Sequence, residues 1–239
     1  VLKDDLVYVA DLFIGIQIIN VSDPNNPTEF LRFGTTGANP RDLCIYESLL
    51  YYSTWYGGIS VVNISNTLNP VEICHIWLSD RIEGLFVSYP YLYAANLEYS
   101  VSVFNITNPS STYKMTEFHE SVLVFDVFVV SNNIYLAGYA HGLSIMTLDK
   151  GGDLQEISQH FFPNHHHSLV IDEPYAYVGD KYSGLHVYNI NCVANQRISV
   201  SLLKAGGFLA LAIVLIKLSL KLLPKILEKL SPYKRGYGL

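Results

Sequence analysis

The sequence has few charged residues, few cysteines and none of the common catalytic motifs. Charged residues make up only 15% of the 239 residues, while half of the residues are apolar. This composition favours strands packed face to face over helices with solvated stripes. No Gly-rich phosphate loop, His-Glu-x-x-His pair, Cys-x-x-Cys pair or Gly-x-Ser-x-Gly elbow occurs. We therefore expect a protein without enzyme activity, cofactor or bound metal.

A short phrase that opens with tyrosine recurs along the chain with a nearly constant spacing. Its copies begin at Tyr8, Tyr51, Tyr93, Tyr135 and Tyr177. Each tyrosine is followed by a Gly or Ser and then by an alternating apolar run, as in Leu143-Ser144-Ile145. Alternation with period two between turn residues is typical of strands, and a repeat of about 40 to 45 residues with four strands is typical of a propeller blade. The sequence predicts an all-β fold, a β-propeller with about five visible four-stranded blades.

The fourth repeat indicates where the strands of a blade lie. We expect strands over 126–130, 134–138, 143–148 and 155–161, separated by Asn-rich and Gly-rich turns. The same frame predicts blades over about 1–37, 42–79, 84–121, 126–162 and 168–201. Val1 aligns with the middle of a first strand, so further blades are expected to precede it.

Three of the repeats share a second motif, which follows the alternating run. The phrases Ile18-Ile19-Asn20-Val21-Ser22-Asp23-Pro24, 61–66 and 103–109 are in register, and the first two are followed by Asn-Pro. These phrases resemble the LVIVD repeat. The resemblance covers about 1–191 and implies a β-propeller of the cell-surface type, with the motif on the third strand of each blade. The fourth and fifth repeats lack the Asn-Pro turn.

The three cysteines do not indicate a disulfide framework. Cys44 is expected on the innermost strand of blade two and Cys74 on the outermost strand. Strands are separated by about 4.8 Å within a sheet, so these two thiols lie too far apart to pair. We expect free or buried thiols.

The chain changes character after residue 200. Residues 205–216 carry no charge, and lysines spaced at four follow them. The apolar length approaches the roughly 20 residues that cross a bilayer, and the lysine spacing is typical of a basic amphipathic helix. We expect a domain over 1–201, a hydrophobic transmembrane or amphipathic anchor helix over 202–230, and a basic tail over 231–239. The alternative is a helix buried in an oligomer or against the propeller.

The two parts have opposite charge. Residues 1–200 hold 8 Lys and Arg against 20 Asp and Glu, a net charge of −12, whereas 201–239 hold 7 against one, a net charge of +6. An acidic propeller offers no basic surface for nucleic acid. Because basic tails favour the cytoplasmic leaflet, the propeller is expected on the extracellular side of the cell membrane.

Connections between blades lie at the rim of the central channel, where propellers commonly bind ligands. The polar side chains expected at this mouth are Arg41, Asp42, Glu83, Asp126, His165 and His167. The histidines belong to the run 165–167, and alternate residues of an extended run share one side. A solvated turn is the simpler interpretation of this run, since metal binding needs three or four converging ligands.

Three Asn-x-Ser/Thr triplets occupy equivalent positions of the first three repeats. The possible glycosylation sites are Asn20, Asn63 and Asn105. Glycans there would support an extracellular location. The alternative is that duplication copied the triplet for its turn-forming value.

These observations lead to three functional hypotheses. The first is a membrane-anchored surface propeller without enzyme activity, which acts in binding, adhesion or envelope assembly with other surface proteins. The second is a subunit of a membrane complex or filament, held by its C-terminal helix as a homo- or hetero-oligomer. The third is a metal protein or enzyme with its site in the channel.

Overall fold

The five predicted blades are present in the computed structural model of the chain. The structure describes residues 1–34, 39–55, 57–98, 100–119, 123–139, 142–160, 166–190 and 197–198. The predicted anchor helix over 202–230 and the tail over 231–239 lie outside these residues. Within them, no helix is long and apolar enough to cross a membrane.

Each blade is an antiparallel sheet of four strands that follow one another in chain order. Blade one contains β1 (Leu2–Lys3), β2 (Leu6–Asp11), β3 (Gly15–Asn20) and β4 (Thr28–Phe33). Blade two contains β5 (Pro40–Tyr46), β6 (Leu49–Thr54), β7 (Gly58–Asn63) and β8 (Val71–Ile76). Blade three contains β9 (Ile82–Ser88), β10 (Tyr91–Asn96), β11 (Ser100–Asn105) and β12 (Tyr113–Phe118), with the short 3-10 helix η1 (Pro109–Ser111) before β12.

The last two blades repeat the arrangement. Blade four contains β13 (Val124–Val130), β14 (Asn133–Gly138), β15 (Gly142–Leu148) and β16 (Leu154–His160). Blade five contains β17 (His166–Asp172), β18 (Tyr175–Asp180), β19 (Gly184–Asn189) and β20 (Arg197–Ile198). The strands predicted in the fourth repeat agree closely with these bounds. The all-β prediction and the blade count are confirmed.

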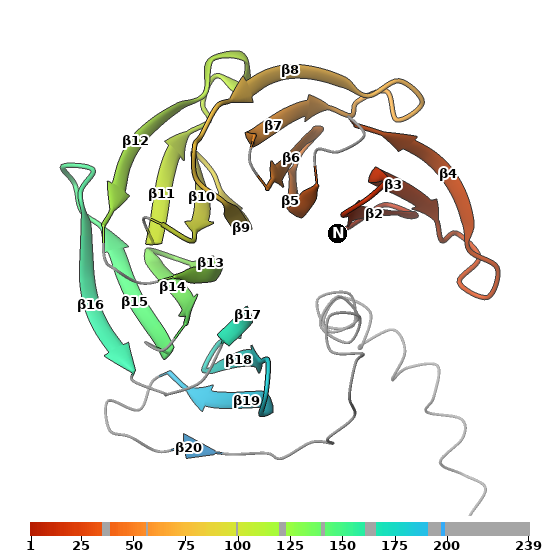
Figure 1. Cartoon of the computed structure of the whole chain (residues 1–239). Coiled ribbons are helices and arrows are strands. Elements are labelled where there is room, and N and C mark those ends of the chain that lie inside the picture. Colours follow the sequence, from red (N-terminus) through yellow and green to blue (C-terminus); the bar gives the residue numbers. More distant parts are fainter. Residues whose placement is uncertain are drawn as a thin grey trace, which may run out of the picture.

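The blades stand side by side around a central axis, with the first strand of each blade innermost (Figure 1). Neighbouring blades touch through their inner strands, since β5 contacts β9, β9 contacts β13, and β13 contacts β17. Blade one contacts blade two through β2, because β1 has only two residues. No comparable contact joins the described strands of blade five to those of blade one, so the described blades form an open arc.

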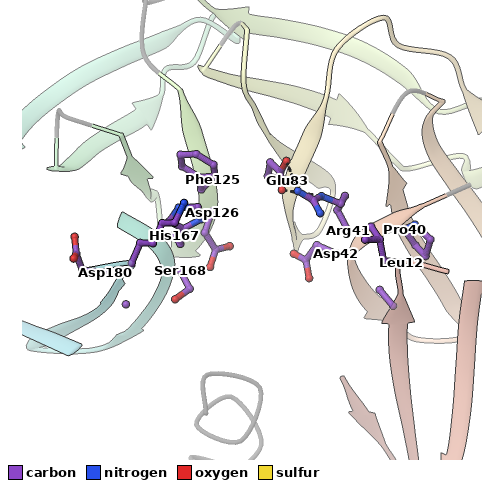
Figure 2. A pocket seen from close by; sticks show the side chains of 13 residues that line it. Leu12, Pro40, Arg41, Asp42, Glu83, Phe125, Asp126, His167, Ser168 and Asp180 are labelled. Atoms are coloured by element: carbon purple, nitrogen blue, oxygen red, sulfur yellow. Dashed lines mark hydrogen bonds and ion pairs between the residues drawn. The ribbon is translucent and has the colours of Figure 1, made fainter. Parts of the chain in front are cut away.

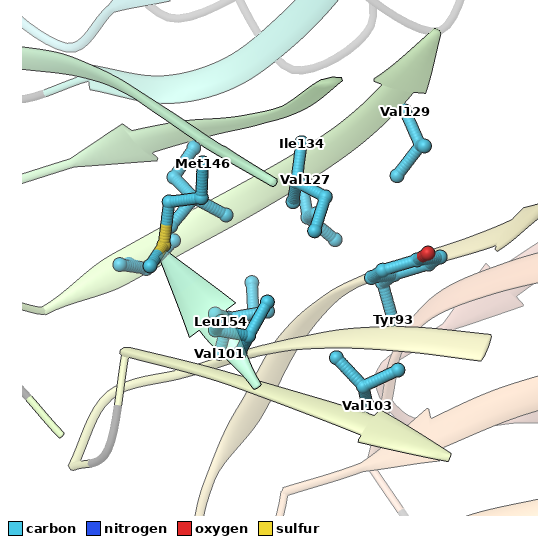
Figure 3. Packing of buried hydrophobic residues seen from close by; sticks show 11 residues of the cluster. Tyr93, Val101, Val103, Val127, Val129, Ile134, Met146 and Leu154 are labelled. Atoms are coloured by element: carbon cyan, nitrogen blue, oxygen red, sulfur yellow. The ribbon is translucent and has the colours of Figure 1, made fainter. Parts of the chain in front are cut away.

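The hydrophobic core is divided among the interfaces between blades. Successive residues of a strand point to opposite faces of its sheet, so Val61 packs against blade three while Val62 packs against blade one. Figure 3 shows the interface of blades three and four, where Tyr93 lies near Val103, Val129 and Ile134. Burial raises the pKa of Tyr93 to about 12. The repeated tyrosine is therefore a core residue of each such interface.

The glycine of the repeat is required by the turn between the second and third strands. Gly58 has a φ of +89°, and a Cβ at this position would lie 1.9 Å from the carbonyl oxygen of Ile76. No other residue fits both the backbone conformation and the close approach of β8. The two cysteines described in the structure, Cys44 in β5 and Cys74 in β8, are not joined by a disulfide, as predicted.

Candidate functional site

A pocket of about 570 Å³ lies at the mouth of the central channel, at the end where the innermost strands begin (Figure 2). All five blades contribute to it. The lining residues are Ala10, Leu12, Pro40, Arg41, Asp42, Glu83, Phe125, Asp126, His167, Ser168, Gly179, Asp180 and Lys181. The structure brings together five of the six polar residues expected at this mouth. The sixth, His165, lies outside the described residues.

A β-bulge in the innermost strand of each of blades two to five turns one side chain into the pocket. The register with the second strand shifts between Pro40 and Leu43, next to Glu83, between Val124 and Asp126, and between His166 and Ser168. The residues set out of register are Arg41, Glu83, Phe125 and His167, each one repeat length from the next. A bulge leaves its extra residue unpaired and redirects its side chain. One fixed irregularity therefore produces one pocket residue in each of blades two to five.

The bulge residues of blades two and three form an ion pair. The guanidinium of Arg41 donates from Nε and Nη2 to the two carboxylate oxygens of Glu83, each at 3.0 Å. The same guanidinium lies 3.9 Å from the centre of the Trp55 ring. A two-point pair of this kind fixes both side chains, and the ring face adds a cation–π contact. Arg41 and Glu83 are thus held in place before any ligand arrives.

The bulge residues of blades four and five form an aromatic contact instead. The rings of Phe125 and His167 have centroids 4.1 Å apart, with planes tilted by 37°. His167 is exposed, whereas its neighbour His166 is fully buried. His166 lies 6.2 Å from the ring of His186 and 6.4 Å from that of Tyr188, within blade five. The two described histidines therefore point to different places: His167 lines the pocket, whereas His166 packs inside blade five.

In blades two and four, the residue after the bulge connects its blade to the next one. One carboxylate oxygen of Asp42 accepts a hydrogen bond from the backbone N–H of Leu85 at 2.8 Å, and Asp126 accepts one from Leu169 at 2.8 Å. Each bond joins a blade to the next. Hydrogen bonds to a charged acceptor are stronger than neutral ones. These two carboxylates are thus structural links as well as pocket residues.

Blade three has glycine at the equivalent position. A Cβ on Gly84 would lie 2.8 Å from the carbonyl oxygen of Phe125 and 2.9 Å from the Cα of Asp126. The backbones of blades three and four therefore approach too closely for any side chain. In blade five the equivalent residue is Ser168.

Asp180 is a buried carboxylate at the blade-five side of the pocket. Its Oδ1 accepts hydrogen bonds from the backbone N–H groups of Tyr182 at 2.8 Å and Ser183 at 2.6 Å, and from the Ser183 hydroxyl at 2.6 Å. Burial alone would raise the pKa of Asp180, but the hydrogen bonds from Ser183 and Tyr182 outweigh it and hold that pKa below its usual value. Asp180 therefore stays ionised and fixes the β18–β19 turn. Ser183 also contacts Nε2 of His186 at 2.7 Å.

The described residues contain no cluster of three or more His, Cys, Asp or Glu side chains that suits a metal ion. His167 is the one histidine among the described residues that line the pocket. The Ser183 hydroxyl lies between Asp180 and His186. A nucleophilic triad requires the histidine between serine and carboxylate. This arrangement is suited to holding a turn.

The three possible glycosylation sites all support the turn that follows the third strand. The side-chain oxygens of Asn20, Asn63 and Asn105 accept hydrogen bonds from the backbone two residues on, at 2.8 Å, 2.9 Å and 3.0 Å. Such bonds stabilise a turn directly. The turn-forming explanation for the repeated triplet therefore has a structural basis, and glycosylation stays a prediction.

Several pocket residues were not identified from the sequence. Phe125, Ser168, Asp180 and Lys181 line the pocket but were absent from the predicted polar ring. A signal for two of them exists, because Phe125 lies one repeat length before His167, and Ser168 lies one repeat length after Asp126. Asp180 ends β18 and Lys181 follows it in the turn to β19, so the spacing of the innermost strands does not reveal either residue.

Comparisons with known proteins agree with this architecture. The family model of the LVIVD repeat matches residues 1–35 and 165–190, which cover blade one and most of blade five. The chain carries LVIVD repeats. The match in blade five shows that the LVIVD repeat extends to a copy without the Asn-Pro turn. No curated protein matches the sequence.

Two solved structures share the fold of this LVIVD-repeat chain. The computationally designed Ika8 protein has a TM-score of 0.61 and 11% sequence identity, over 83% of this chain and 59% of that chain. The computationally designed Ika4 protein has a TM-score of 0.53 and 12% identity, over 66% of this chain and 95% of that chain. The present chain thus spans 59% of the length of the Ika8 chain. At these identities the similarity concerns the fold alone.

Proposed function

We propose that this chain is a surface binding module without enzyme activity, in which the channel mouth contacts the partner. The observation that supports this role is that residues of all five described blades line one pocket at the channel mouth. Rigid scaffolds that carry variable side chains at one end are well suited to recognition. The proposed module acts in adhesion or envelope assembly.

The contacts between blades support a recognition role. Arg41 and Glu83 are paired with each other, and Asp42 and Asp126 hold backbone N–H groups of the next blade. Binding to a preformed surface avoids the entropy cost of ordering side chains. His167 and Lys181 are exposed at the same mouth and are the side chains that we assign to partner contact.

The location of the module is proposed from the sequence of the remaining chain. Residues 205–216 are uncharged, and the basic 201–239 follow a propeller of net charge −12. We propose that 202–230 hold the protein in the cell membrane with the propeller on the extracellular side. The partners would be the membrane and other envelope or surface proteins, and not nucleic acid.

Binding of the purified protein to isolated cell-envelope material tests the channel mouth. We expect the double variant Lys181→Glu with His167→Glu to reduce binding at least tenfold, because both changes put negative charge at the mouth. Lys150→Glu is the matched control, since Lys150 lies at the opposite ends of the strands, between β15 and β16. Equal binding by the double variant and the native protein would refute the proposed contact surface.

Alkaline carbonate extraction tests the membrane anchor. The full chain is expected to stay with the membrane pellet, whereas a chain that ends at residue 201 is expected to be released. Release of the full chain by carbonate would remove the anchor from the proposal without affecting the binding surface.

A role as a subunit of a membrane complex or filament is the second candidate. It is favoured by the small residues of the apolar segment, which would let neighbouring helices approach closely; they are Ala205, Gly206, Gly207, Ala210 and Ala212. Purification with partner proteins in fixed stoichiometry, and loss of these partners on deletion of 202–239, would support this candidate over the first.

A further inference from the structure

Every blade has a forward face, toward the next blade along the chain, and a backward face. Forward faces share the repeated tyrosine and two aliphatic residues after the glycine. In blades one to four these residues are buried against the next blade; they are Tyr8, Ile16, Ile18, Tyr51, Ile59, Val61, Tyr93, Val101, Val103, Tyr135, Leu143 and Ile145. The equivalent residues of blade five, Tyr177, Leu185 and Val187, are only half-buried. They belong to none of the four hydrophobic clusters that join described blades.

The backward face of blade one is open in the same way. Its residues are Val7, Val9, Ile19 and Val21, all half-buried. The equivalent residues of blades two and three are buried against the preceding blade; they are Leu50, Tyr52, Val62, Ile64, Leu92, Ala94, Phe104 and Ile106. The sequence of blade one thus keeps an apolar face for which no described blade provides a partner.

A polar group in blade five points to the same conclusion. Ser168 occupies the position of Asp42 and Asp126, whose carboxylates accept a hydrogen bond from the next blade. The Ser168 hydroxyl oxygen is buried, and it has no hydrogen-bond partner among the described residues. Buried hydroxyls are normally paired. In blades two and four the partner at this position is a backbone N–H of the following innermost strand.

We propose that a further four-stranded blade of the LVIVD type packs between blade five and blade one. Its backward face would supply aliphatic residues to Tyr177, Leu185 and Val187, and its forward face a tyrosine and two aliphatic residues to the face of blade one. Its innermost strand would present a backbone N–H to Ser168. This inference concerns the end faces and is independent of the binding role of the channel mouth.

The shape of the arc favours a blade over a second copy of the chain. The described blades enclose most of a circle around the axis, which leaves no space for another five blades in the same ring (Figure 1). The Ika8 chain, which shares the fold over 83% of this chain, continues well beyond the matched part. A helix would serve less well than a strand, because its N–H groups beyond the first turn are bonded within the helix, whereas an innermost strand offers an N–H at the same position as in blades three and five.

Addition of a blade to the full chain tests the proposal. The fusion places a copy of residues 82–127 directly before Val1. Val1 is the repeat equivalent of Phe128, so it follows the copied residue 127 in the fusion as Phe128 does in the native chain. This copy supplies blade three and completes β1. The matched control carries Tyr93→Ser, Val101→Ser and Val103→Ser within the copy, so that β1 is still completed but the forward face is polar. Circular dichroism establishes that both fusions are folded.

Two neighbouring residues of β3 report whether the face of blade one is covered. Ile18 faces blade two and Ile19 faces the open side. In the unfused chain, Ile19→Ala is expected to lower the thermal midpoint less than half as much as Ile18→Ala. In the fusion the shift caused by Ile19→Ala is expected to grow at least twofold, and in the polar control it is expected to stay unchanged. The fusion itself should melt about 5 °C or more above the control.

Other results would overturn the proposal. Equal growth of the Ile19→Ala shift in the two fusions would show that the forward face of a blade is not what covers blade one. Equal shifts from Ile18→Ala and Ile19→Ala in the unfused chain would show that the face is already covered. If that equality disappears on deletion of 202–239, the covering segment is the C-terminal one, and if it disappears on dilution, it is a second copy.

Discussion

Blade three and blade one are built from the same repeat but bury their faces unequally. Blade three has Tyr93 buried against blade four and Phe104 buried against blade two. Blade one has Ile18 fully buried against blade two, whereas its neighbour Ile19 is half-buried on the other face. The repeat therefore determines which face a residue occupies, and the neighbouring blade determines how much that residue stabilises the fold.

The largest effect is expected from the contrast within β3. Ile18→Ala leaves a cavity in a closed interface and should lower the free energy of unfolding by about 2–5 kcal/mol. Ile19→Ala should cost less than half as much, because its side chain is already partly in water. Urea unfolding of both variants measures the difference. Similar costs would mean that the two faces of blade one are equally covered.

The link between blades four and five is expected to have the next largest effect. Asp126→Ala leaves the buried N–H of Leu169 without an acceptor and should cost about 1.5–3 kcal/mol. Asp126→Asn keeps an acceptor oxygen and should cost clearly less. The same pair of changes at Asp42 tests whether both linked interfaces behave alike. An equal loss from Ala and Asn at position 126 would contradict the importance of the acceptor.

The interface between blades three and four relies on close backbone approach in place of such a link. Gly84→Ala would force these blades apart and should cost about 1–3 kcal/mol. Gly151→Ala is the control, because a Cβ there meets only side-chain atoms, the nearest of them in Asp149 at 3.2 Å. Thermal unfolding of both variants gives the comparison. Unchanged stability of Gly84→Ala would show that the blades can separate freely at this point.

The smallest expected effect is a difference in how stability depends on pH between variants of two buried carboxylates, Asp180 and Asp80. The pKa of Asp180 is lowered, because hydrogen bonds from Ser183 and Tyr182 outweigh burial. Asp180 therefore stabilises the fold above the unfolded pKa of about 3.9, and this contribution is lost as pH falls through the lower folded pKa. Asp180→Asn should flatten the loss of stability below pH 4 in urea unfolding series.

Asp80 is the control, because its pKa is shifted in the direction opposite to that of Asp180. Burial is the main cause that raises its pKa, so its charged form is disfavoured in the folded protein. Asp80→Asn should therefore not reduce stability at neutral pH, and its stability difference from the native protein should shrink as pH falls through the raised pKa. Parallel pH profiles for the two variants would contradict the assigned causes.

The sequence was sufficient to predict the blades but not the details of the pocket. The constant spacing of the tyrosines and the alternation of apolar residues depend only on the order of residues along the chain, and both survive in the structure. The bulges depend on register between two strands, which no single strand encodes. Arg41, Glu83 and His167 were predicted at the mouth because they are polar, and their apolar repeat equivalent Phe125 was left out of the predicted polar ring, although its bulge turns it into the same pocket.

The histidine run illustrates the same limit. Alternation alone placed His165 and His167 on one side. The structure has the bulge between His166 and Ser168, so that His166 enters blade five and His167 turns into the pocket. The sequence could not show which face of blade one is covered, because Ile18 and Ile19 are both isoleucines in the same strand.

The recurring bulge separates the residues that stabilise the fold from the residues that face a partner at the channel mouth. In blades two to five, one residue is set out of register and takes no part in the alternation that fills the core; these residues are Arg41, Glu83, Phe125 and His167. Duplication of a repeat therefore copies the framework and one adjustable position together. A lineage of such chains can diversify its recognition chemistry at four sites while its folding sequence stays constant.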